Sequence, residues 1–544
     1  MAKRKRAEGT SGGNAAGSTG RSKKAKGTVA LESKRSTSQS QQPKQPQPKQ
    51  SQPKQSQPKQ SQPTPQPKSQ SQVQRPTTDG LTLQIVTGSY DRVLHGILAT
   101  VTSEEKVEFA DTFLFNAHPS AIRCVALSPP SNPVPGQEQK VLLASGSTDS
   151  KINIYTLSAH PPKRREKDEM STAGLRPILE NSKNRELGAY NPHDSTVTKL
   201  VFPTRSKLIS SSEDSTISVA KTRNWETMST IKVPIPKAQG RPSGDTAPLG
   251  GTPAGVNDFA VHPSMKLLIS VSKGERSIRL WNLLTGKKAA VLNFSREMLQ
   301  DIGEGKHSTG EGRKVVWGTT AESEEFAVGF DRDIVVFGMD SLPRCRVMPD
   351  ARTKIHHFEY VSVDDESETT LIAVSTEDGR ILFCSTREED LTRPPSSTSK
   401  EQRLPVSKLV AQIGGKEAGV TGRIKDFNVV RVEEQDETVF YVVSGSSDGK
   451  VRLWKLSAKE LLSRSKEGTA GKADKQETPE ASPAAPQVGN LLGTYETNNR
   501  ITCTAAFAMI PRPDDLDDSD DEMDELEDET DNSSEDGDED GNEE

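Results

Sequence analysis

Short runs of alternating apolar and polar residues fill the chain between about residues 81 and 507, and one pattern recurs in them seven times. Each copy consists of an alternating run, a short polar segment with an acidic residue, and a second run. The three clearest copies are LLASGSTDSKINIY (142–155), LISSSEDSTISVA (208–220) and VVSGSSDGKVRLW (442–454). Alternation with a period of two predicts half-buried β-strands, and the polar segment predicts a tight turn. The sequence therefore predicts a series of β-hairpins.

Four weaker copies complete the set: IVTGSYDRVLHGI (85–97), LISVSKGERSIRLW (268–281), FAVGFDRDIVVF (326–337) and IAVSTEDGRILFC (372–384). The acidic turn residues are Asp91, Asp149, Asp214, Glu275, Asp331, Asp378 and Asp448. The position six residues later is mostly large and apolar, as at Trp281 and Trp454, which resembles a WD40 repeat. Recurrent units of this kind bury their faces against their neighbours. The predicted fold class is therefore all-β, a seven-bladed WD40 β-propeller.

Six of the hairpins are preceded by a further strand pattern, at residues 122–128, 197–202, 256–262, 314–320, 355–361 and 424–430. The first hairpin, at 83–98, follows a Pro-rich tract and has no such strand before it. An isolated strand pattern, RITCTAAFA, occurs at 500–508. We expect it to complete the N-terminal blade and close the ring, because closure removes exposed sheet edges. The propeller is predicted to span residues 81–510.

The two ends of the chain have a different composition from the middle. Residues 1–80 contain basic clusters and a Gln/Pro/Lys tract, and residues 511–544 are strongly acidic. Such segments lack the apolar residues that a core requires, so both are predicted to be disordered. The net charge is -6, and residues 514–544 contribute 20 Asp and Glu without any Lys or Arg, which leaves +14 for the rest. Residues 1–35 account for +8 of that charge.

The N-terminal arm carries two basic clusters that are typical of nuclear-import signals. They consist of Lys3, Arg4, Lys5 and Arg6, followed by Arg21, Lys23, Lys24 and Lys26. Clusters of this kind also attract nucleic acid through phosphate charge. In the acidic tail, Ser519 and Ser533 have acidic residues three positions later, which resembles an acidophilic kinase site.

No motif for catalysis or metal binding is found. A nucleophile elbow, a phosphate-binding glycine loop and an HExxH sequence are all absent, and the four cysteines show no CxxC spacing. His118 and His193 precede strands in the position where WD40 repeats carry a histidine that bonds the acidic turn, so a structural role is expected. His356 and His357 are adjacent on a predicted strand, and strict alternation would point them to opposite faces. We predict a non-enzymatic protein with no cofactor and no metal.

Polar segments stretch the repeats beyond the usual length of this motif. They lie at 129–139, 158–185, 235–254, 296–312, 386–408 and 457–490. Loops of this length without secondary structure are usually disordered or carry binding functions. One of them contains KRREK (163–167), a candidate contact for RNA or an acidic protein.

The order of motifs resembles the p21-activated-kinase-interacting WD40 family. The quoted stretches are IVTGSYDRVLHG, FNAHPSAIRCVALS, LLASGSTDSKINIYTL, RELGAYNPHDSTVTKLVF, ISSSEDSTISVAKTRNWE, VNDFAVHPSMKLLISVSKGERSIRLWNLLTGKKA and KVVWGTTAESEEFAVGFDRDIVVF. They cover about residues 81–385 in order and include Trp225 and Trp317; later blades match only the general repeat. The long arm, the stretched loops and the acidic tail depart from the family.

This resemblance implies a non-catalytic scaffold in maturation of the large (60S) ribosomal subunit, located in the nucleus and nucleolus. Its implied partners are pre-60S assembly factors and ribosomal proteins, and the chain is expected to be a monomer within a larger complex, without membrane contact. We expect the basic arm to attract pre-rRNA. Two alternatives stay open: a negative regulator that binds a p21-activated protein kinase, and a histone-binding propeller, which the acidic tail would suit.

Overall fold

The computed structural model describes residues 80–162, 178–179, 181, 183–236, 254–304, 308–320, 323–349, 352–364, 369–393, 403–434, 437–467 and 486–512. All of them belong to one compact unit, Gln74–Glu544. The basic arm, the KRREK segment, the acidic tail, Ser519 and Ser533 lie outside the described residues. The predicted bounds of the arm and tail stay predictions.

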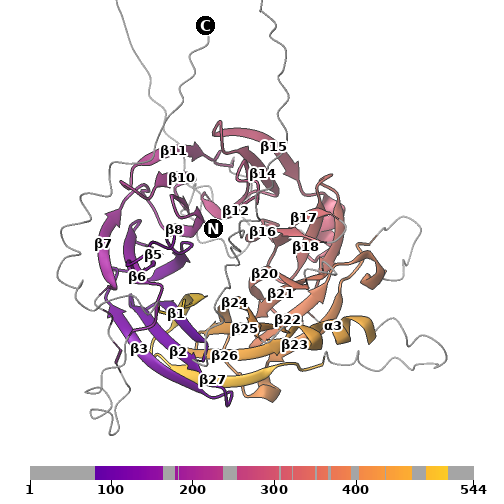
Figure 1. Cartoon of the computed structure of the whole chain (residues 1–544). Helices are drawn as coiled ribbons and strands as arrows, with labels where there is room; N and C mark the ends of the chain where they lie inside the picture. Colours follow the sequence, from indigo (N-terminus) through magenta and orange to yellow (C-terminus); the bar gives the residue numbers. More distant parts are fainter. Residues whose placement is uncertain are drawn as a thin grey trace, which may run out of the picture. The chain divides into compact units, whose positions relative to one another are not determined.

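Seven antiparallel four-stranded sheets form the blades of a propeller, which confirms the predicted fold class (Figure 1). The first, inner strands are β28 (Ile501–Ala508), β4 (Ile122–Leu127), β8 (Val197–Thr204), β12 (Val256–Val261), β16 (Lys314–Thr319), β20 (Ile355–Asp364) and β24 (Ile424–Glu434). The second strands are β1 (Thr82–Ser89), β5 (Lys140–Ser147), β9 (Lys207–Ser212), β13 (Leu267–Ser272), β17 (Glu324–Gly329), β21 (Thr369–Thr376) and β25 (Glu437–Ser446).

The hairpins continue outward from the second strands. The third strands are β2 (Leu94–Val101), β6 (Ile152–Ser158), β10 (Thr216–Lys221), β14 (Ser277–Asn282), β18 (Ile334–Gly338), β22 (Arg380–Ser385) and β26 (Lys450–Ser457). The outer strands are β3 (Val107–Phe115), β7 (Arg185–Tyr190), β11 (Thr227–Lys232), β15 (Lys287–Asn293), β19 (Pro343–Val347), β23 (Lys408–Gly414) and β27 (Asn490–Glu496). We number the blades 1 to 7 in the order of their second strands.

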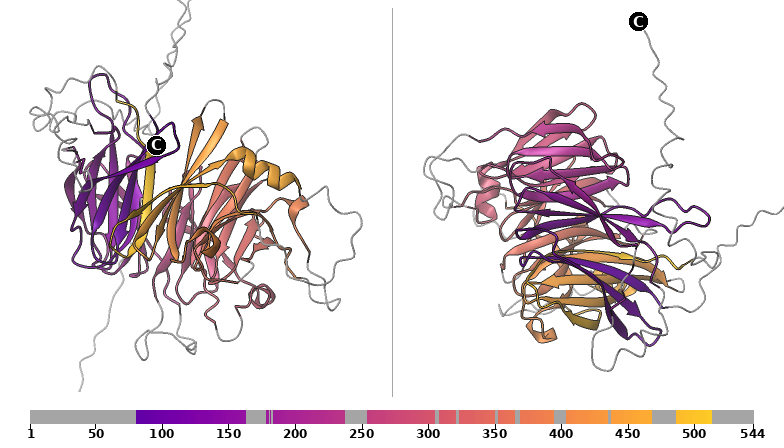
Figure 2. Two further views of the ribbon diagram at one scale, coloured as in Figure 1. Left: turned by 90° about the horizontal axis from the view of Figure 1, so that it is seen from below. Right: turned by 90° about the vertical axis from the view of Figure 1, so that its left-hand side faces the viewer.

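Contacts between inner strands run around the whole propeller. Each inner strand contacts the inner strand of the next blade, and the series returns from β24 through β28 to β4. Blade 1 combines both ends of the folded region, because β28 pairs antiparallel with β1, from Leu83 opposite Ala508 to Ser89 opposite Ile501. Figure 2 shows the yellow β28 beside the indigo strands of this blade. The ring is therefore closed by a strand that follows all the others in sequence.

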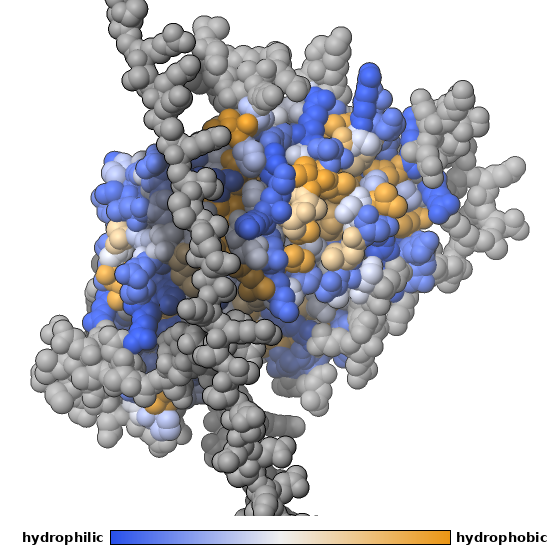
Figure 3. Space-filling model, turned by 90° about the horizontal axis from the view of Figure 1, so that it is seen from above, coloured by the Kyte–Doolittle hydropathy of each residue, from blue (hydrophilic) through white to orange (hydrophobic). Residues whose placement is uncertain are grey.

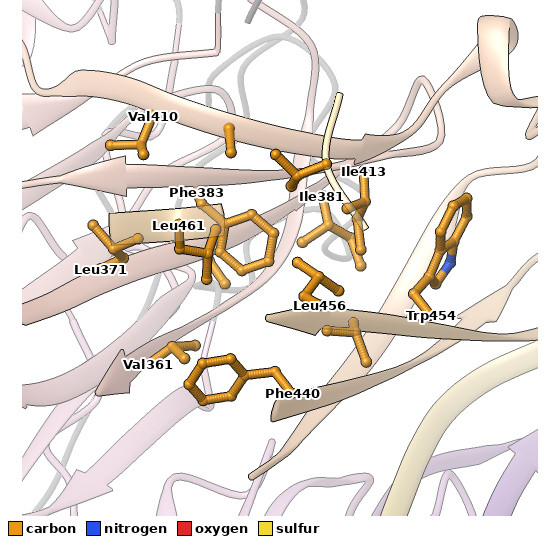
Figure 4. Close-up of a cluster of buried hydrophobic side chains, with 14 of the residues drawn as sticks. Val361, Leu371, Ile381, Phe383, Val410, Ile413, Phe440, Trp454, Leu456 and Leu461 are labelled. Carbon is orange, nitrogen blue, oxygen red and sulfur yellow. The ribbon is translucent and has the colours of Figure 1, made fainter. Parts of the chain in front are cut away.

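The core lies between neighbouring blades rather than within any one of them. Between blades 6 and 7, Phe383 of β22 and Phe440 of β25 belong to one buried cluster with Trp454 of β26 (Figure 4). Their exposed fractions are 1, 2 and 4 %. Burying an apolar side chain of this size stabilises the fold by about 1.5–3 kcal/mol. Since the seven larger clusters each take residues from two neighbouring blades, a blade loses much of its core when its neighbour is removed.

The long inserted segments are more ordered than the sequence suggested. Helix α2 (Arg296–Asp301) lies within the 296–312 segment, a 3-10 turn η1 (Glu388–Asp390) within 386–408, and helix α3 (Ala458–Glu467) within 457–490. Leu461 of α3 packs into the cluster between blades 6 and 7 (Figure 4). At these positions buried residues such as Met298, Asp390 and Leu461 anchor the helical turns to the ring.

The outer edge of blade 4 is exposed. Strand β15 has the sequence KKAAVLN, and only Leu292 in it is partly shielded. Figure 3 views the side of the propeller where β11 and β15 lie and shows apolar residues gathered among charged ones. Lys287 and Lys288 begin this strand, and charged side chains on an edge strand disfavour pairing with another chain.

Removing the closing strand should destabilise the ring. Deletion of residues 499–544 removes β28, the inner strand of blade 1. The side chains of Ile501, Cys503 and Ala505 in this strand are at most 6 % exposed, so the deletion also removes part of the core. We expect a lower melting temperature and increased binding of a dye that reports exposed apolar surface. Deletion of 514–544 alone is the matched control and should leave the melting temperature nearly unchanged. Equal melting of both deletions would contradict closure by β28.

Candidate functional site: the acidic turns and the mouth of the ring

The acidic turn of blade 2 is held by a buried histidine. His118 Nδ1 lies 3.1 Å from Oδ2 of Asp149, and its Nε2 lies 2.9 Å from Oγ of Ser145. The imidazole has no exposed surface. A carboxylate accepts hydrogen bonds, so Nδ1 donates to Asp149 and Nε2 accepts from the serine hydroxyl. This arrangement ties the turn to the second strand and leaves no open position for a substrate.

Blade 3 repeats the arrangement with His193, Asp214 and Ser210. The two histidine contacts are 3.1 and 2.8 Å long. Burial alone would raise the pKa of Asp214, but hydrogen bonds from His193, from Thr216 and from the backbone of Asp194 lower it to about 2. The carboxylate therefore remains ionised as an acceptor, which suits a structural bond and not proton transfer at neutral pH.

In blades 4 and 7 an arginine of the third strand takes the place of the histidine. Arg279 Nε donates to Glu275 over 3.0 Å, and Arg452 donates to Asp448 over 3.0 Å. Arg452 is only 5 % exposed, so its charge depends on this partner. Sequence reasoning missed both arginines, although each follows its acid by four residues on the same strand pattern.

The remaining acids have other partners. Asp378 accepts from Arg380 over 2.8 Å, and exposed Asp91 accepts the backbone N–H of Arg500 over 2.9 Å. Asp331 pairs with Lys354 at 3.1 Å and with a second cation, Arg313, at 3.4 Å. The seven turn acids therefore lie at equivalent places but do not come together into one site.

A β-bulge recurs near the start of the inner strands. In β20, Ile355 pairs with Thr376 and His357 with Ser375, so His356 is the extra residue. The same irregularity occurs in β28, β4, β8, β12 and β24. An extra residue of this kind redirects the side chains on either side of it. The residues that follow the bulge, with Lys314 of β16 at the matching register, are Cys503, Cys124, Lys199, Asp258, Lys314, His357 and Asp426.

These seven equivalent residues link neighbouring inner strands around the axis of the ring. Lys199 pairs with Asp258 at 2.8 Å, and Asp258 also accepts the backbone N–H of Val315 over 2.9 Å. Asp426 accepts the backbone N–H of Thr504 over 2.9 Å, which connects blade 7 to the closing strand. Buried carboxylates with such partners fix the spacing of adjacent blades.

The two adjacent histidines do not follow strict alternation, so that expectation was wrong. His356 Nε2 lies 3.4 Å from Lys425, and His357 Nδ1 lies 3.1 Å from Asp426, so both rings reach β24. The bulge between Ile355 and His357 accounts for the change. Burial and then the nearby Lys425 lower the pKa of His356 to about 4. Burial and Lys314 hold the pKa of His357 well below its ordinary value, so both rings are neutral at pH 7.

A pocket of about 180 Å³ opens beside these histidines, between blades 5 and 6. Its lining includes the cations Arg313, Lys314 and Lys354, together with His356 and the rings of Phe330 and Phe358. The arrangement presents positive charge around an apolar floor. Its chemistry suits an anion, and it offers neither a nucleophile nor a set of metal ligands.

The described part of the chain has no group of three or more His, Cys, Asp or Glu side chains arranged to hold a metal. The four cysteines are buried and free. Burial raises the pKa of the Cys124 thiol to about 12, and a thiol that stays protonated is a poor nucleophile. None of the described helices is long and apolar enough to span a membrane.

The Asp448 turn gives a test of its structural role. Asp448→Ala leaves the buried Arg452 charge without its carboxylate, which costs about 1–3 kcal/mol. We expect a lower midpoint in urea unfolding, measured by circular dichroism. Asp91→Ala is the control, since that exposed acid accepts one backbone N–H and holds no buried charge. An Asp448→Ala protein of full stability that had lost a binding partner would instead assign Asp448 to a binding surface.

We expect the stability of the fold to depend on pH through Glu359 of β20. Burial and then Asp426 raise the pKa of Glu359 to about 8, while its carboxyl oxygen accepts the N–H of Val429 over 3.1 Å. A raised pKa stabilises the fold at low pH, and this contribution is lost as the pH rises through about 8. Glu359→Gln keeps an acceptor oxygen and does not ionise. Its melting temperature relative to the wild type should therefore increase between pH 5 and pH 9.

Exposed Glu104, paired with Lys106 at 2.7 Å, provides the control for this measurement. Glu104→Gln should show no such gain between pH 5 and pH 9. A constant difference between Glu359→Gln and the wild type across this range would contradict a neutral Glu359 in the folded protein.

The family model described as "WD domain, G-beta repeat" matches residues 110–156, 184–219 and 436–455. These ranges contain the turns of Asp149, Asp214 and Asp448. The match thus covers blades in which the acid is held by histidine and one in which it is held by arginine.

Curated relatives match longer stretches. Protein MAK11 of Saccharomyces cerevisiae is 28% identical over 407 residues, covering 70% of this chain and 79% of the yeast protein. A p21-activated protein kinase-interacting protein 1-like of Xenopus laevis is 22% identical over 425 residues, covering 78% and 82%. Its Danio rerio counterpart is 26% identical over 220 residues, covering 40% and 45%. Together with the seven blades, these matches show a seven-bladed WD40 β-propeller that is similar to MAK11 and to the p21-activated protein kinase-interacting proteins.

Proposed function

We propose that this chain is a non-catalytic scaffold in maturation of the large (60S) ribosomal subunit in the nucleolus. The support comes from the family resemblance, which implies this role, and from the similarity to MAK11 across most of both chains. The polar groups at the turns bond to each other and to backbone, so they hold the ring together and leave no reactive group poised for chemistry. We infer that the ring acts by binding other molecules.

The observation that carries the proposal is the closed ring itself. Its blades share their cores, and its inner strands are joined by carboxylates such as the buried Asp258 and the partly buried Asp426. A rigid ring presents its surface loops at fixed separations, so several assembly factors or ribosomal proteins can dock at once without ordering the scaffold first. The proposed mechanism is thus placement of partners, with no bond made or broken.

Affinity purification of the full chain, followed by mass spectrometry and RNA sequencing, tests this function. We expect pre-60S assembly factors, ribosomal proteins and 27S-type precursor RNA. The chain lacking residues 499–544 is the control, and it should lose these partners because its ring is open. A purification dominated by histones, without ribosomal precursors, would contradict the proposal.

The names of the vertebrate relatives favour a second candidate, a contact with a p21-activated protein kinase. The same purification separates the two functions. Enrichment of a kinase from a cytoplasmic fraction, with no precursor RNA, would favour kinase regulation and contradict a nucleolar role.

The basic arm, which lies outside the described residues, is proposed to direct nuclear import. Deleting residues 1–35 removes a charge of +8 and both basic clusters. We expect a fluorescent fusion of residues 36–544 to accumulate less in the nucleus while the propeller still binds its protein partners. A full-length fusion in which the eight residues of the two basic clusters are changed to Gln should show the same reduction in nuclear accumulation as the 36–544 fusion. Unchanged nuclear accumulation of both would place targeting in the propeller.

A further inference from the structure

Cationic side chains gather where the inner strands of blades 5, 6, 7 and 1 begin. Equivalent inner strands start at the same end of the ring, so residues at or just before their first positions surround one mouth. We call the following residues the mouth cluster: Arg313, Lys314, Lys354, Arg423, Lys425 and Arg500. Nothing in the repeat requires cations at these places, because the matching positions before β8 and β12 hold Thr196 and Gly255.

Only part of this charge is neutralised. Asp331 pairs with Arg313 and Lys354, and Glu377 pairs with Arg423 at 3.2 Å. The other three cations form no ion pair with a carboxylate of any described residue. An uncompensated group of cations attracts a polyanion, and the attraction is stronger in a recess that excludes water.

Lys314 and Lys425 contact histidine rings rather than carboxylates. Lys314 Nζ lies 3.0 Å from Nδ1 of His357, and Lys425 Nζ lies 3.4 Å from Nε2 of His356. Both imidazoles are neutral, so they orient the ammonium groups without cancelling their charge. Burial and then the nearby charge of Arg423 lower the pKa of Lys425, because both disfavour its protonated form. An anion at this place would favour the protonated form.

The pocket of about 180 Å³ between blades 5 and 6 provides a place for such an anion. Arg313, Lys314 and Lys354 line it, and neutral His356 adds a ring N–H donor. Lys314 and His356 can donate to a phosphate group there, and Arg313 and Lys354, which also pair with Asp331, add positive charge around it.

An exposed aromatic side chain adjoins the cluster. Tyr90, in the acidic turn of blade 1, is 60 % exposed, and its backbone N–H donates to the backbone carbonyl of Arg500 over 2.8 Å. The Arg500 guanidinium lies 5.5 Å from the centre of the Tyr90 ring. Exposed rings beside cations are the surfaces on which single-stranded nucleic acids stack their bases.

We propose that the mouth cluster binds single-stranded nucleic acid, with a backbone phosphate in the pocket between blades 5 and 6 and a base stacked on Tyr90. This goes beyond the proposed function, in which RNA is attracted by the arm and the ring contacts proteins. The chain's own acidic tail is the less suitable occupant. The backbone N–H of Met509 bonds to Thr82 at the far end of blade 1 from Arg500, so the tail begins at the opposite face.

Fluorescence anisotropy with labelled 15-nucleotide polyuridine RNA tests the proposal on the full chain. Lys314→Gln/Lys425→Gln removes two cations of the mouth cluster, one of which lines the pocket. We expect affinity in 50 mM salt to fall by about tenfold or more, and the slope of log affinity against log salt to flatten by about 1.4. The control is Lys287→Gln/Lys288→Gln, which removes the same charge from exposed β15. It should change affinity far less.

Tyr90→Ala and Tyr90→Phe provide a second test that does not disturb the core, since the side chain is exposed. Loss of the ring should weaken RNA binding several-fold, whereas Phe should preserve it because stacking needs no hydroxyl. Circular dichroism melting of each variant checks that the ring is intact. The same measurements with DNA of equal length show whether the ribose contributes.

Two results would overturn the proposal. Equal weakening by the mouth and β15 variants, with Tyr90→Ala unchanged, would mean that binding follows net charge or the arm. Binding of a peptide of residues 513–544 that exceeds RNA binding and is lost in Lys314→Gln/Lys425→Gln would make an acidic segment the occupant. Neither result bears on co-purification with pre-60S particles, so the proposed function would be judged separately.

Discussion

The pairing of β28 with β1 is the contact on which the rest of the structure depends. It joins residues more than 400 positions apart: Gly88 lies opposite Cys503, and the Thr502 hydroxyl donates to the carbonyl of Gly88 over 3.0 Å. Without it, the inner strands of blades 7 and 2 would lose their neighbour. The cores shared between blades and the polar contacts around the axis can form completely only when all seven blades are present.

Ring closure also determines where charge can gather. Because equivalent inner strands start on one face, a substitution at one repeat position changes the mouth of the ring without changing the blade core. His357 and Asp426 follow the repeated bulge, and Lys314 of the regular strand β16 lies at the matching register, yet the charges of the three residues differ. The repeat therefore supplies the geometry, and the individual residues supply the specificity. The uneven distribution of cations over blades 5, 6, 7 and 1 follows from this freedom.

The hairpins, the first strands and the closing strand could be predicted from sequence because half-buried strands alternate with a period of two. The partners of the acidic turns could be predicted only where a histidine marked them, as at His118 and His193. Arg279 and Arg452 were missed because the sequence does not show whether an arginine on a strand is buried against a partner or exposed to solvent. The bulge at His356 was missed since one extra residue leaves no signal in a short run. Helices α2 and α3 escaped prediction because tertiary contacts of a few residues, such as Leu461, hold them in place.

Native-state hydrogen exchange measures most directly whether the seven blades form one closed ring. The amides of β28 are the decisive ones, in particular Thr504, which donates to Asp426 across the blade boundary. If closure makes the ring cooperative, these amides exchange with the same opening free energy as the central amides of β24 and β25. Exchange of β28 at a much lower free energy, while β24 and β25 stay protected, would show that the last strand is an appendage and would contradict the account.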